Sequence, residues 1–363
     1  MKENSLENEK IIEIRDPNAV RIPQKVLTKL DILKKTSFGT GLREALNNIV
    51  SGGMGALILV HNPNAINVFQ GGFKVNCKFT SKRLVELAKM DCAIVLSEDF
   101  KKILYANTLL IPNSSLSTME TGSRHQAAER AAKQINGLVI AISQRMGKIT
   151  IFYRNSKYIL QNTEDLLRRA TETLQILEKQ RDVFDELTTN LNILEVTDLV
   201  SVGDVCNLLQ RLGMIKKMAE IINEYIIGLG KDGLIVRMRM REITKGIDKN
   251  KDFMAKDYGL KDSRIKPFFD NLNFEELLDT ENIARNLFEE LLDKEVFTKG
   301  YRILSKSDLD KDSIEILIKN FKNLNNIFSA SKQDLVNIFG EKAEDFIKNL
   351  NNLREQIMIG KKI

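Results

Sequence analysis

The amino-acid sequence predicts an α/β domain followed by two all-α regions. Short apolar runs flanked by glycine recur between residues 38 and 153, as in buried strands. Four of the five prolines lie in the first third of the chain, so the segment from there to Pro267 is free to form long helices. After Thr163, apolar residues recur at spacings of three, four and seven, which predicts helices with one buried stripe.

The first domain combines short strands with three helices. Helices are expected at residues 42–50, at 81–90 with Thr80 as N-cap, and at 127–134, where alanine is frequent. Strands are expected at residues 55–60, 66–69, 92–96, 103–105, 138–143 and 149–153. The second strand is expected to pair with the first, and the last two to form a hairpin around Gly147. Because these runs are so apolar, we expect both faces of the sheet to be covered.

The rest of the chain is predicted to be helical. One stripe consists of Leu167, Ala170, Leu174, Leu177, Phe184, Leu187, Leu191 and Leu194. Further helices are expected at residues 202–227, 234–247, 313–321, 332–338 and 343–353. The charged segment 248–262 is expected to be a connector. We therefore expect three domains, at residues 1–155, 156–295 and 296–363.

Composition excludes several classes of protein. No run of about eighteen apolar residues occurs, so no membrane span is expected, and the charged N-terminus does not resemble a signal peptide, which predicts a cytoplasmic location. The three cysteines are far apart and only two histidines occur, which argues against a disulfide framework, a zinc ribbon or a histidine-rich metal centre. A formal charge of +6 and a pI of about 9.0 are compatible with nucleotide or nucleic-acid partners.

The segment Glu120-Thr-Gly-Ser-Arg-His-Gln-Ala-Ala-Glu-Arg130 has the composition of a phosphate-binding helix start. A small polar turn leads directly into a helix, where free backbone N–H groups and the helix dipole favour an anion. Arg124 adds a forked cation and His125 a titratable donor. The alternative is an ordinary helix cap with a surface arginine.

Asp91 lies where a helix gives way to a buried strand. A carboxylate there can hold Mg²⁺ or Mn²⁺ and assist deprotonation of a hydroxyl, or it can simply end the helix. Two glycine clusters, Ser51-Gly-Gly-Met-Gly55 and Gly71-Gly72-Phe73, flank strands. They permit tight turns or close approach of a ligand, and neither matches the P-loop or dinucleotide-binding spacing.

Together and in this order, these segments resemble the DisA family, DNA integrity scanning proteins with diadenylate cyclase activity. The stretches that carry the resemblance are Gly55-Ala-Leu-Ile, Gly71-Gly-Phe, Leu87-Ala-Lys-Met-Asp91, Lys102-Ile-Leu-Tyr-Ala-Asn-Thr108, Glu120-Thr-Gly-Ser-Arg-His125, Ala128-Glu-Arg and Leu138-Val-Ile-Ala-Ile-Ser143. The resemblance covers nearly the whole chain and is densest between Leu42 and Tyr153.

The resemblance implies a mixed sheet wrapped by helices, an all-α spine and a C-terminal helix-hairpin-helix domain. It implies a homo-oligomer, an octamer, in which cyclase domains meet face to face and each face holds one ATP with Mg²⁺ or Mn²⁺. Asp91 matches the acid of the family's Asp-Gly-Ala motif, which implies a catalytic role in metal binding and in activating the ribose 3′-hydroxyl. Arg124 and His125 match Arg-His-Arg and are implied to hold the triphosphate. The other implied ATP-binding positions are Gly72, Cys92, Leu110, Ser123, Gln126 and Ala127.

The chain departs from the family motifs at three positions. Cys92 stands where Asp-Gly-Ala has glycine, Gln126 replaces the second arginine of Arg-His-Arg, and Ala127 replaces a common hydroxyl residue. We expect the fold and the ATP site to persist and the activity to be open to reduction or loss.

The C-terminal hairpins depart further from the resemblance. The Gly-x-Gly of the second hairpin reads Gly340-Glu-Lys342, and the first hairpin carries the aspartates Asp308, Asp310 and Asp312. The implied DNA contacts are Gly340, Lys319, Lys322 and Lys342. DNA binding is therefore expected to be inherited but weak.

Three functions remain open on this basis. The first is a cyclase whose output is coupled to DNA structure, which Asp91, Arg124 and His125 favour. The second is a catalytically weakened nucleotide- and DNA-binding protein on the same fold, which Cys92 and Gln126 favour. The third, a purely structural helical oligomer, does not account for the Gly-Ser-Arg-His segment.

Overall fold

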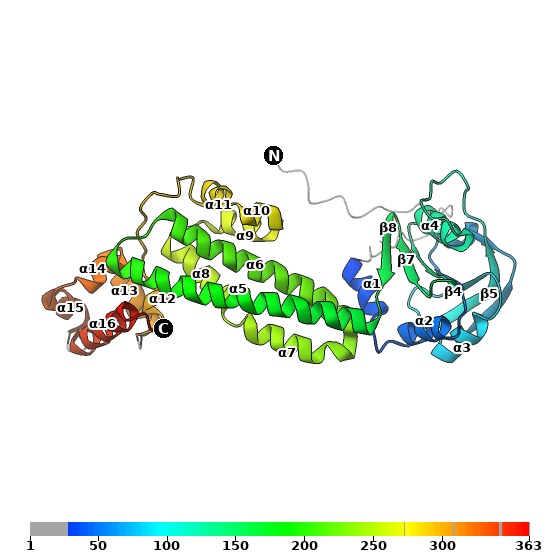
Figure 1. Cartoon of the computed structure of the whole chain (residues 1–363), viewed down its shortest axis with the longest axis horizontal. Coiled ribbons are helices and arrows are strands. Elements are labelled where there is room, and N and C mark those ends of the chain that lie inside the picture. Colours follow the sequence, from blue (N-terminus) through cyan, green and yellow to red (C-terminus); the bar gives the residue numbers. More distant parts are fainter. Residues whose placement is uncertain (1–27, 272, 308, 341–342, 363) are drawn as a thin grey trace, which may run out of the picture. The chain divides into compact units, whose positions relative to one another are not determined.

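The computed structural model describes residues 28–271, 273–307, 309–340 and 343–362 (Figure 1). The chain divides into two compact units. The first comprises residues up to Arg169 together with Glu224–Leu234, and the second comprises Ala170–Asn223 together with the residues from Ile235 onward. No helix in the described part of the chain is long and apolar enough to cross a membrane.

The first unit is built on a mixed sheet. Among the described residues the sheet has eight strands in the order β2-β5-β4-β1-β6-β7-β8, with β3 also paired to β5. The strands are β1 (Ala56–Val60), β2 (Phe69–Gln70), β3 (Phe73–Lys78), β4 (Ala93–Leu96), β5 (Lys102–Leu110), β6 (Leu138–Ile142), β7 (Ile149–Tyr153) and β8 (Ser156–Leu160). The pair β1 and β4 is parallel and the other pairs are antiparallel.

Helices cover both faces of this sheet, as the sequence predicts. On one face α1 (Lys29–Lys35), α2 (Gly41–Ser51) and α3 (Ser81–Leu87) pack on strand residues such as Ile58. On the other face α4 (Ser123–Ile135) packs through its alanines on the alternate strand residues, such as Leu59. Thr80 caps α3, accepting a hydrogen bond from the backbone N–H of Arg83 at 3.2 Å.

Part of the prediction for the sheet is wrong. Residues 65–67 form a 3₁₀ helix, η1, and the short strand that follows, β2, pairs with β5 and not with β1. Strands β3 and β8 were not predicted, because their exposed and half-buried residues alternate without an apolar run. Strand β8 also lies beyond residue 155, where the first domain was expected to end.

The helical region begins with the long helices α5 (Thr163–Thr197) and α6 (Val202–Leu229) and continues with α7 (Leu234–Ile243). The predicted stripe of α5 is largely buried, although Leu167 is exposed. The prediction of a connector at residues 248–262 is wrong, since most of this segment forms α8 (Ile247–Asp257). Its apolar residues Ile247, Met254 and Ala255 are buried between charged residues. Three shorter helices follow: α9 (Asp262–Asn271), α10 (Phe274–Leu278) and α11 (Thr280–Leu287).

The described part of the C-terminal region contains α12 (Tyr301–Leu304), α13 (Lys311–Phe321), α14 (Leu324–Phe328), α15 (Lys332–Phe339) and α16 (Ala343–Met358). It has its own apolar core, in which the rings of Phe339 and Phe346 stack at 4.2 Å between α15 and α16. The buried guanidinium of Arg302, on α12, pairs with the buried carboxylate of Glu195, on α5, at 2.5 Å. The helices expected at residues 313–321, 332–338 and 343–353 are confirmed.

Gly72 ties the turn before β3 to the backbone of β5. Its φ is +71°, and a Cβ at this position would lie 2.5 Å from the carbonyl oxygen of Ala106 and 2.7 Å from that of Asn107. Gly71 provides a contrast within the same turn, because its φ is +68° and no atom lies within 4 Å of the corresponding Cβ position. A side chain at Gly71 would therefore meet backbone strain alone, whereas a side chain at Gly72 would meet both strain and steric overlap.

We predict that Gly72→Ala lowers the free energy of unfolding of the α/β unit by about 2–4 kcal/mol, the sum of left-handed strain and overpacking. Gly71→Ala is the matched control and should cost only about 1–2 kcal/mol, from strain alone. Urea unfolding, monitored through hydrogen exchange of the β5 amides, measures the loss of unfolding free energy in both variants. Equal losses in the two variants would contradict this packing.

Candidate functional site

The parallel pairing of β1 and β4 brings the predicted site to one edge of the sheet. Leu57 is the register partner of Ala93, so Gly55 and Asp91, each two residues earlier, lie at corresponding positions beyond the two strands. Ala93 is also paired with Thr108 on β5, whose hydroxyl donates to the Ala93 carbonyl oxygen at 2.9 Å. The start of β1, the start of β4 and the last third of β5 therefore share this edge.

The guanidinium of Arg124 lies against the backbone of Gly55. A Cβ at Gly55 would be 2.2 Å from Nη1 and 2.8 Å from Cζ of Arg124, so any side chain there would displace the guanidinium. The backbone of Gly55 does not have a left-handed φ, and space alone accounts for the glycine. Arg124 is half-buried and forms no hydrogen bond or ion pair with the residues described, which leaves its charge available to a ligand.

The start of α4 presents backbone donors beside this arginine. Gly122 is the N-cap and has no side chain to cap the helix, and the first turn carries no acidic residue. The first backbone N–H groups of a helix have no intrahelical partners and attract anions. Exposed Ser123 begins the helix, so its amide and hydroxyl are accessible beside Arg124.

His125 follows on the same turn and is half-buried, with its ring edge-on to Phe152 at 6.2 Å. Burial lowers the pKa of His125 below its ordinary value; the charge of Glu120 opposes this, and those of Lys157 and Arg124 reinforce it. The imidazole is therefore mainly neutral at pH 7 and can donate one hydrogen bond without adding charge. An anion bound at the helix start would raise this pKa.

Gln126 contributes to the loop and not to the cationic surface, and Ala127 is half-buried on α4. The amide of Gln126 donates to the carbonyl oxygen of Glu120 at 2.8 Å and closes the loop onto α4. Glu120 in turn forms an ion pair with Lys157 on β8. The glutamine that replaces an arginine of the family motif thus has a structural partner.

Three further α4 side chains hold the preceding loop. Glu129 accepts a hydrogen bond from the Thr118 hydroxyl at 2.5 Å, Arg130 donates to the carbonyl oxygen of Leu116 at 2.9 Å, and Lys133 donates to that of Ser117 at 2.9 Å. Although burial opposes ionisation of Glu129, its hydrogen bonds with Lys133 and Thr118 lower its pKa. The start of α4 is therefore fixed by contacts along the length of the helix.

Asp91 is exposed and forms no hydrogen bond or ion pair with any residue in the described ranges. The described residues contain no group of three or more His, Cys, Asp or Glu side chains able to hold a metal ion. A lone carboxylate still fits Mg²⁺, which retains several waters and is commonly held by one or two carboxylates and by substrate phosphates. Asp91 could therefore share a metal with a nucleotide but could not hold it alone.

Cys92 occupies the backbone conformation that favours glycine. Its φ is +73°, and the side chain is exposed as a free thiol. A side chain in the left-handed region costs about 1–2 kcal/mol. The backbone here therefore adopts a conformation that favours glycine, the residue of the family motif, although this chain carries a side chain.

The remaining positions expected to bind the nucleotide, Gly72 and Leu110, lie beside β5 and on it. Gly72 packs against the β5 backbone, which explains this glycine without a ligand. Leu110 is only 8% exposed and belongs to the core under α4, whereas its neighbours Leu109 and Ile111 are 51% and 42% exposed. Strand alternation turns Leu110 inward and leaves Leu109 at the surface.

The positions expected to contact DNA lie near the turns of the C-terminal helices. Lys319 and Lys322 are exposed at the end of α13, and Lys322 has a φ of +67°. Gly340 ends α15 with an exposed backbone and a φ of +59°, and Lys342 lies outside the described residues. Asp310 is the N-cap of α13 and accepts a hydrogen bond from the Ser313 hydroxyl at 2.6 Å, which explains one aspartate of the first hairpin.

Sequence reasoning missed the direct partner of Arg124. The sequence predicted a tight turn or close approach of a ligand at Gly55 and placed it in a stretch that carries the family resemblance, but it gave no signal that Arg124 packs on this glycine. A cavity of about 430 Å³ lies at the opposite edge of the sheet, beyond the carboxyl end of β1 at His61, and does not include the candidate site.

Comparison with known proteins identifies related chains. The family model for the DisA bacterial checkpoint controller nucleotide-binding region matches residues 43–157, and the model for the linker region of the same controller matches residues 160–290. The DNA integrity scanning protein DisA of Clostridioides difficile (strain 630) is 39% identical over 343 residues, 91% of this chain and 96% of the relative. Its counterparts in Clostridium botulinum (strain Eklund 17B / Type B) and Clostridium kluyveri are each 41% identical, over 92% and 91% of this chain and 97% of each relative.

The strain at Cys92 leads to a prediction of stability. Cys92→Gly should raise the free energy of unfolding by up to about 1 kcal/mol, because relief of the left-handed strain exceeds the entropy that glycine adds to the unfolded chain. Cys92→Ala keeps the strain and should give no gain. Urea midpoints of the three proteins test this, and a midpoint for Cys92→Gly at or below that of Cys92→Ala would count against it.

Proposed function

Because the chain belongs to the DisA family of DNA integrity scanning proteins, we propose that it is a diadenylate cyclase that joins two ATP molecules into cyclic di-AMP and responds to DNA structure. The observation that carries the proposal is the unpaired Arg124 at the uncapped start of α4, on the sheet edge shared with Asp91. At that edge, Arg124 and the start of α4 would bind the triphosphate, and Asp91 supplies a carboxylate.

In this reaction the 3′-oxygen of each ATP attacks the α-phosphorus of the other. A new P–O3′ bond forms as the bond from the α-phosphorus to the pyrophosphate oxygen breaks, and the hydroxyl proton is released. Two such steps close the ring and release two pyrophosphates. Positioning and charge neutralisation supply most of the acceleration of such transfers.

Each residue at the sheet edge has a role in this scheme. Arg124 and the α4 amides hold phosphate oxygens, and neutral His125 donates a further hydrogen bond. Asp91 would hold Mg²⁺ or Mn²⁺ together with the nucleotide phosphates, and the ion would neutralise phosphate charge and favour ionisation of the 3′-hydroxyl. Exposed Cys92 lies beside the nucleotide, where its thiol narrows the space that glycine would leave.

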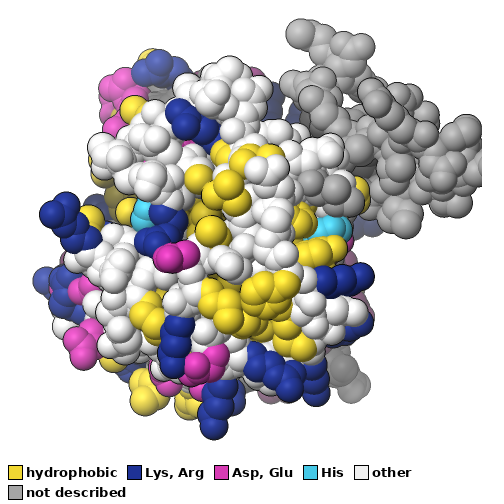
Figure 2. Space-filling view, turned by 90° about the vertical axis from the view of Figure 1, so that its right-hand side faces the viewer, with side chains coloured by type: hydrophobic (Ala, Val, Ile, Leu, Met, Phe, Trp, Pro, Cys, Tyr) yellow, Lys and Arg dark blue, Asp and Glu magenta, His cyan; other side chains and the backbone are white. Residues whose placement is uncertain are grey.

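One α/β unit supplies one set of these groups, so two units must face each other to close the ring. Apolar side chains are exposed on the end of the unit that carries β5, with lysine and arginine around them (Figure 2). Phe73, Leu109 and Ile111, at 46%, 51% and 42% exposure, lie on β3 or at the end of β5, next to the candidate edge. This apolar surface supports self-association, for which we propose the octamer implied by the resemblance.

The C-terminal helices supply the proposed DNA contact. Short helices joined by tight turns can donate backbone N–H groups to phosphates, and Lys319 and Lys322 add exposed positive charge. The hairpins retain few glycines, so the proposed binding is weak, independent of base sequence and sensitive to salt.

One observation favours the second candidate function, a nucleotide- and DNA-binding protein with little catalytic activity. Gln126 lacks the second cation of the family motif, and its amide is engaged by the Glu120 carbonyl oxygen. Phosphate charge in the transition state is then neutralised less completely than in the family pattern.

Incubating the purified full chain with ATP and Mg²⁺ or Mn²⁺, with mass analysis of the products, separates the two functions. We predict cyclic di-AMP and pyrophosphate from the wild-type chain. Asp91→Asn should reduce synthesis by at least about a hundredfold, the scale of a lost charge-stabilising group, without changing assembly. Glu98→Gln is a matched control, since Glu98 is an exposed carboxylate that follows β4 as Asp91 precedes it.

A wild-type chain that binds ATP but forms no cyclic di-AMP would reject the cyclase and support the second function. If Asp91→Asn remained as active as Glu98→Gln, the role assigned to Asp91 would be wrong.

A further inference from the structure

A second group of cations surrounds a small cavity within the helical unit. The cavity, of about 100 Å³, is lined by Arg181, Arg302, Lys306 and Lys362, together with the carboxylate of Asp185. These residues come from α5, from α12 and the turn after it, and from the C-terminal end of the chain. The carboxylate of Asp185 and that of Glu195, which pairs with Arg302, balance two of these four cations, so the group keeps an excess of positive charge.

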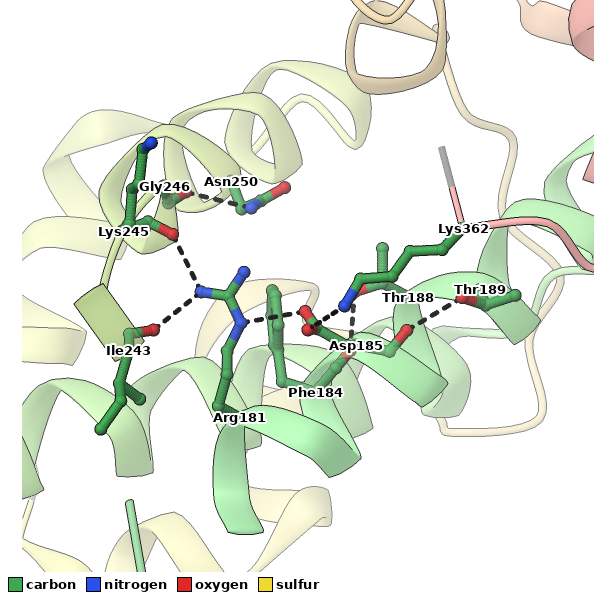
Figure 3. Close-up of polar contacts among 10 residues, drawn as sticks. All are labelled: Arg181, Phe184, Asp185, Thr188, Thr189, Ile243, Lys245, Gly246, Asn250 and Lys362. Carbon is green, nitrogen blue, oxygen red and sulfur yellow. Dashed lines mark hydrogen bonds and ion pairs between the residues drawn. The ribbon is translucent and has the colours of Figure 1, made fainter. Parts of the chain in front are cut away.

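The carboxylate of Asp185 is already shared by two of these cations. Arg181 donates from Nε to Oδ1 at 3.0 Å, and Lys362 donates from Nζ to Oδ2 at 2.5 Å (Figure 3). A second Arg181 nitrogen, Nη1, donates to the carbonyl oxygens of Ile243 and Lys245 at 3.0 and 2.9 Å. Asp185 therefore has little capacity left to neutralise the rest of the lining.

Of the other two cations, Arg302 is buried and ion-paired with Glu195, whereas Lys306 is exposed. Arg302 is 3% exposed, and its terminal nitrogens bind Glu195 and Asn192 on α5. The Nε of Arg302 is buried and has no hydrogen-bond partner among the described residues. The ammonium of Lys306 likewise has no partner in the described ranges.

A buried guanidinium nitrogen without an acceptor is costly unless a water or an anion supplies one, and the Nε of Arg302 is such a nitrogen among the described residues. One water needs about 10–15 Å³ on this measure of volume, so the cavity holds several waters or one group of a few heavy atoms. A tetrahedral oxyanion has this size and offers several acceptors to arginine and lysine donors. A nucleotide or a DNA duplex is too large to enter.

We propose that this cavity binds one small tetrahedral oxyanion, with inorganic phosphate as its probe. Lys306 and Lys362 reach the ion from the C-terminal region, and Arg181 from α5. Binding therefore ties the C-terminal segment to α5, in the unit that also carries the proposed DNA-binding helices. An ion bound in the cavity would stabilise the packing of the C-terminal segment against α5.

Equilibrium dialysis of the full chain against radiolabelled orthophosphate tests the proposal. Because the proposed nucleotide site also attracts phosphate, binding is measured with and without excess ATP. We predict one equivalent of phosphate binding that resists ATP and is displaced by unlabelled sulfate. Lys306→Gln removes a cation with no partner in the described structure and should weaken this binding by at least about tenfold.

Lys311→Gln is the matched control, because Lys311 is an exposed lysine five residues further on that does not line the cavity, and its binding should equal that of the wild type. Absence of ATP-resistant binding, or equal affinities in Lys306→Gln and Lys311→Gln, would overturn the proposal. Displacement of the phosphate by a DNA duplex would also overturn it, by assigning these cations to nucleic acid.

Discussion

The contact between the Arg124 guanidinium and the bare Cα of Gly55 is the constraint on which the candidate site depends. It holds a cation that has no partner among the described residues at the sheet edge where β1 and β4 begin, and Gly55 lies there at the position that corresponds to Asp91. The surrounding structure keeps both partners in place. The alternate residues of β1 anchor the strand in the two cores of the sheet, and the buried alanines of α4 set the depth of the helix.

The substitutions in the family motifs preserve this geometry. Gln126 exchanges the charge of an arginine for a hydrogen bond that closes the loop before α4. Cys92 keeps a left-handed φ of +73° at the cost of strain. Gln126 removes a positive charge and Cys92 adds a thiol at this edge, so nucleotide binding and catalytic rate are separate questions for this chain.

The sequence was sufficient to predict the buried strands and the long helices, because apolar runs and the stripe of α5 report directly on burial. The prediction failed at β3 and β8, whose mixed exposure lacks such a run. It also failed at α8, where charged residues separate the three buried apolar residues Ile247, Met254 and Ala255. Arg124 and His125 could be singled out because a polar turn before an alanine-rich helix is a local signal. The Gly55 contact depends on tertiary packing between β1 and α4, and in the helical cavity Arg181 lies more than a hundred residues in sequence from the other three cations.

Nucleotide affinity of a Gly55→Ala variant tests the central claim most directly. The added Cβ would displace the flexible end of Arg124 without disturbing backbone, so we predict ATP binding weakened by about tenfold or more and an unchanged unfolding midpoint. Gly52→Ala adds a methyl group in the same turn against the flexible end of Met54, with no contact to Arg124, and should bind ATP as the wild type does. Wild-type affinity in Gly55→Ala would contradict the account, because Arg124 would then not hold the nucleotide from this position.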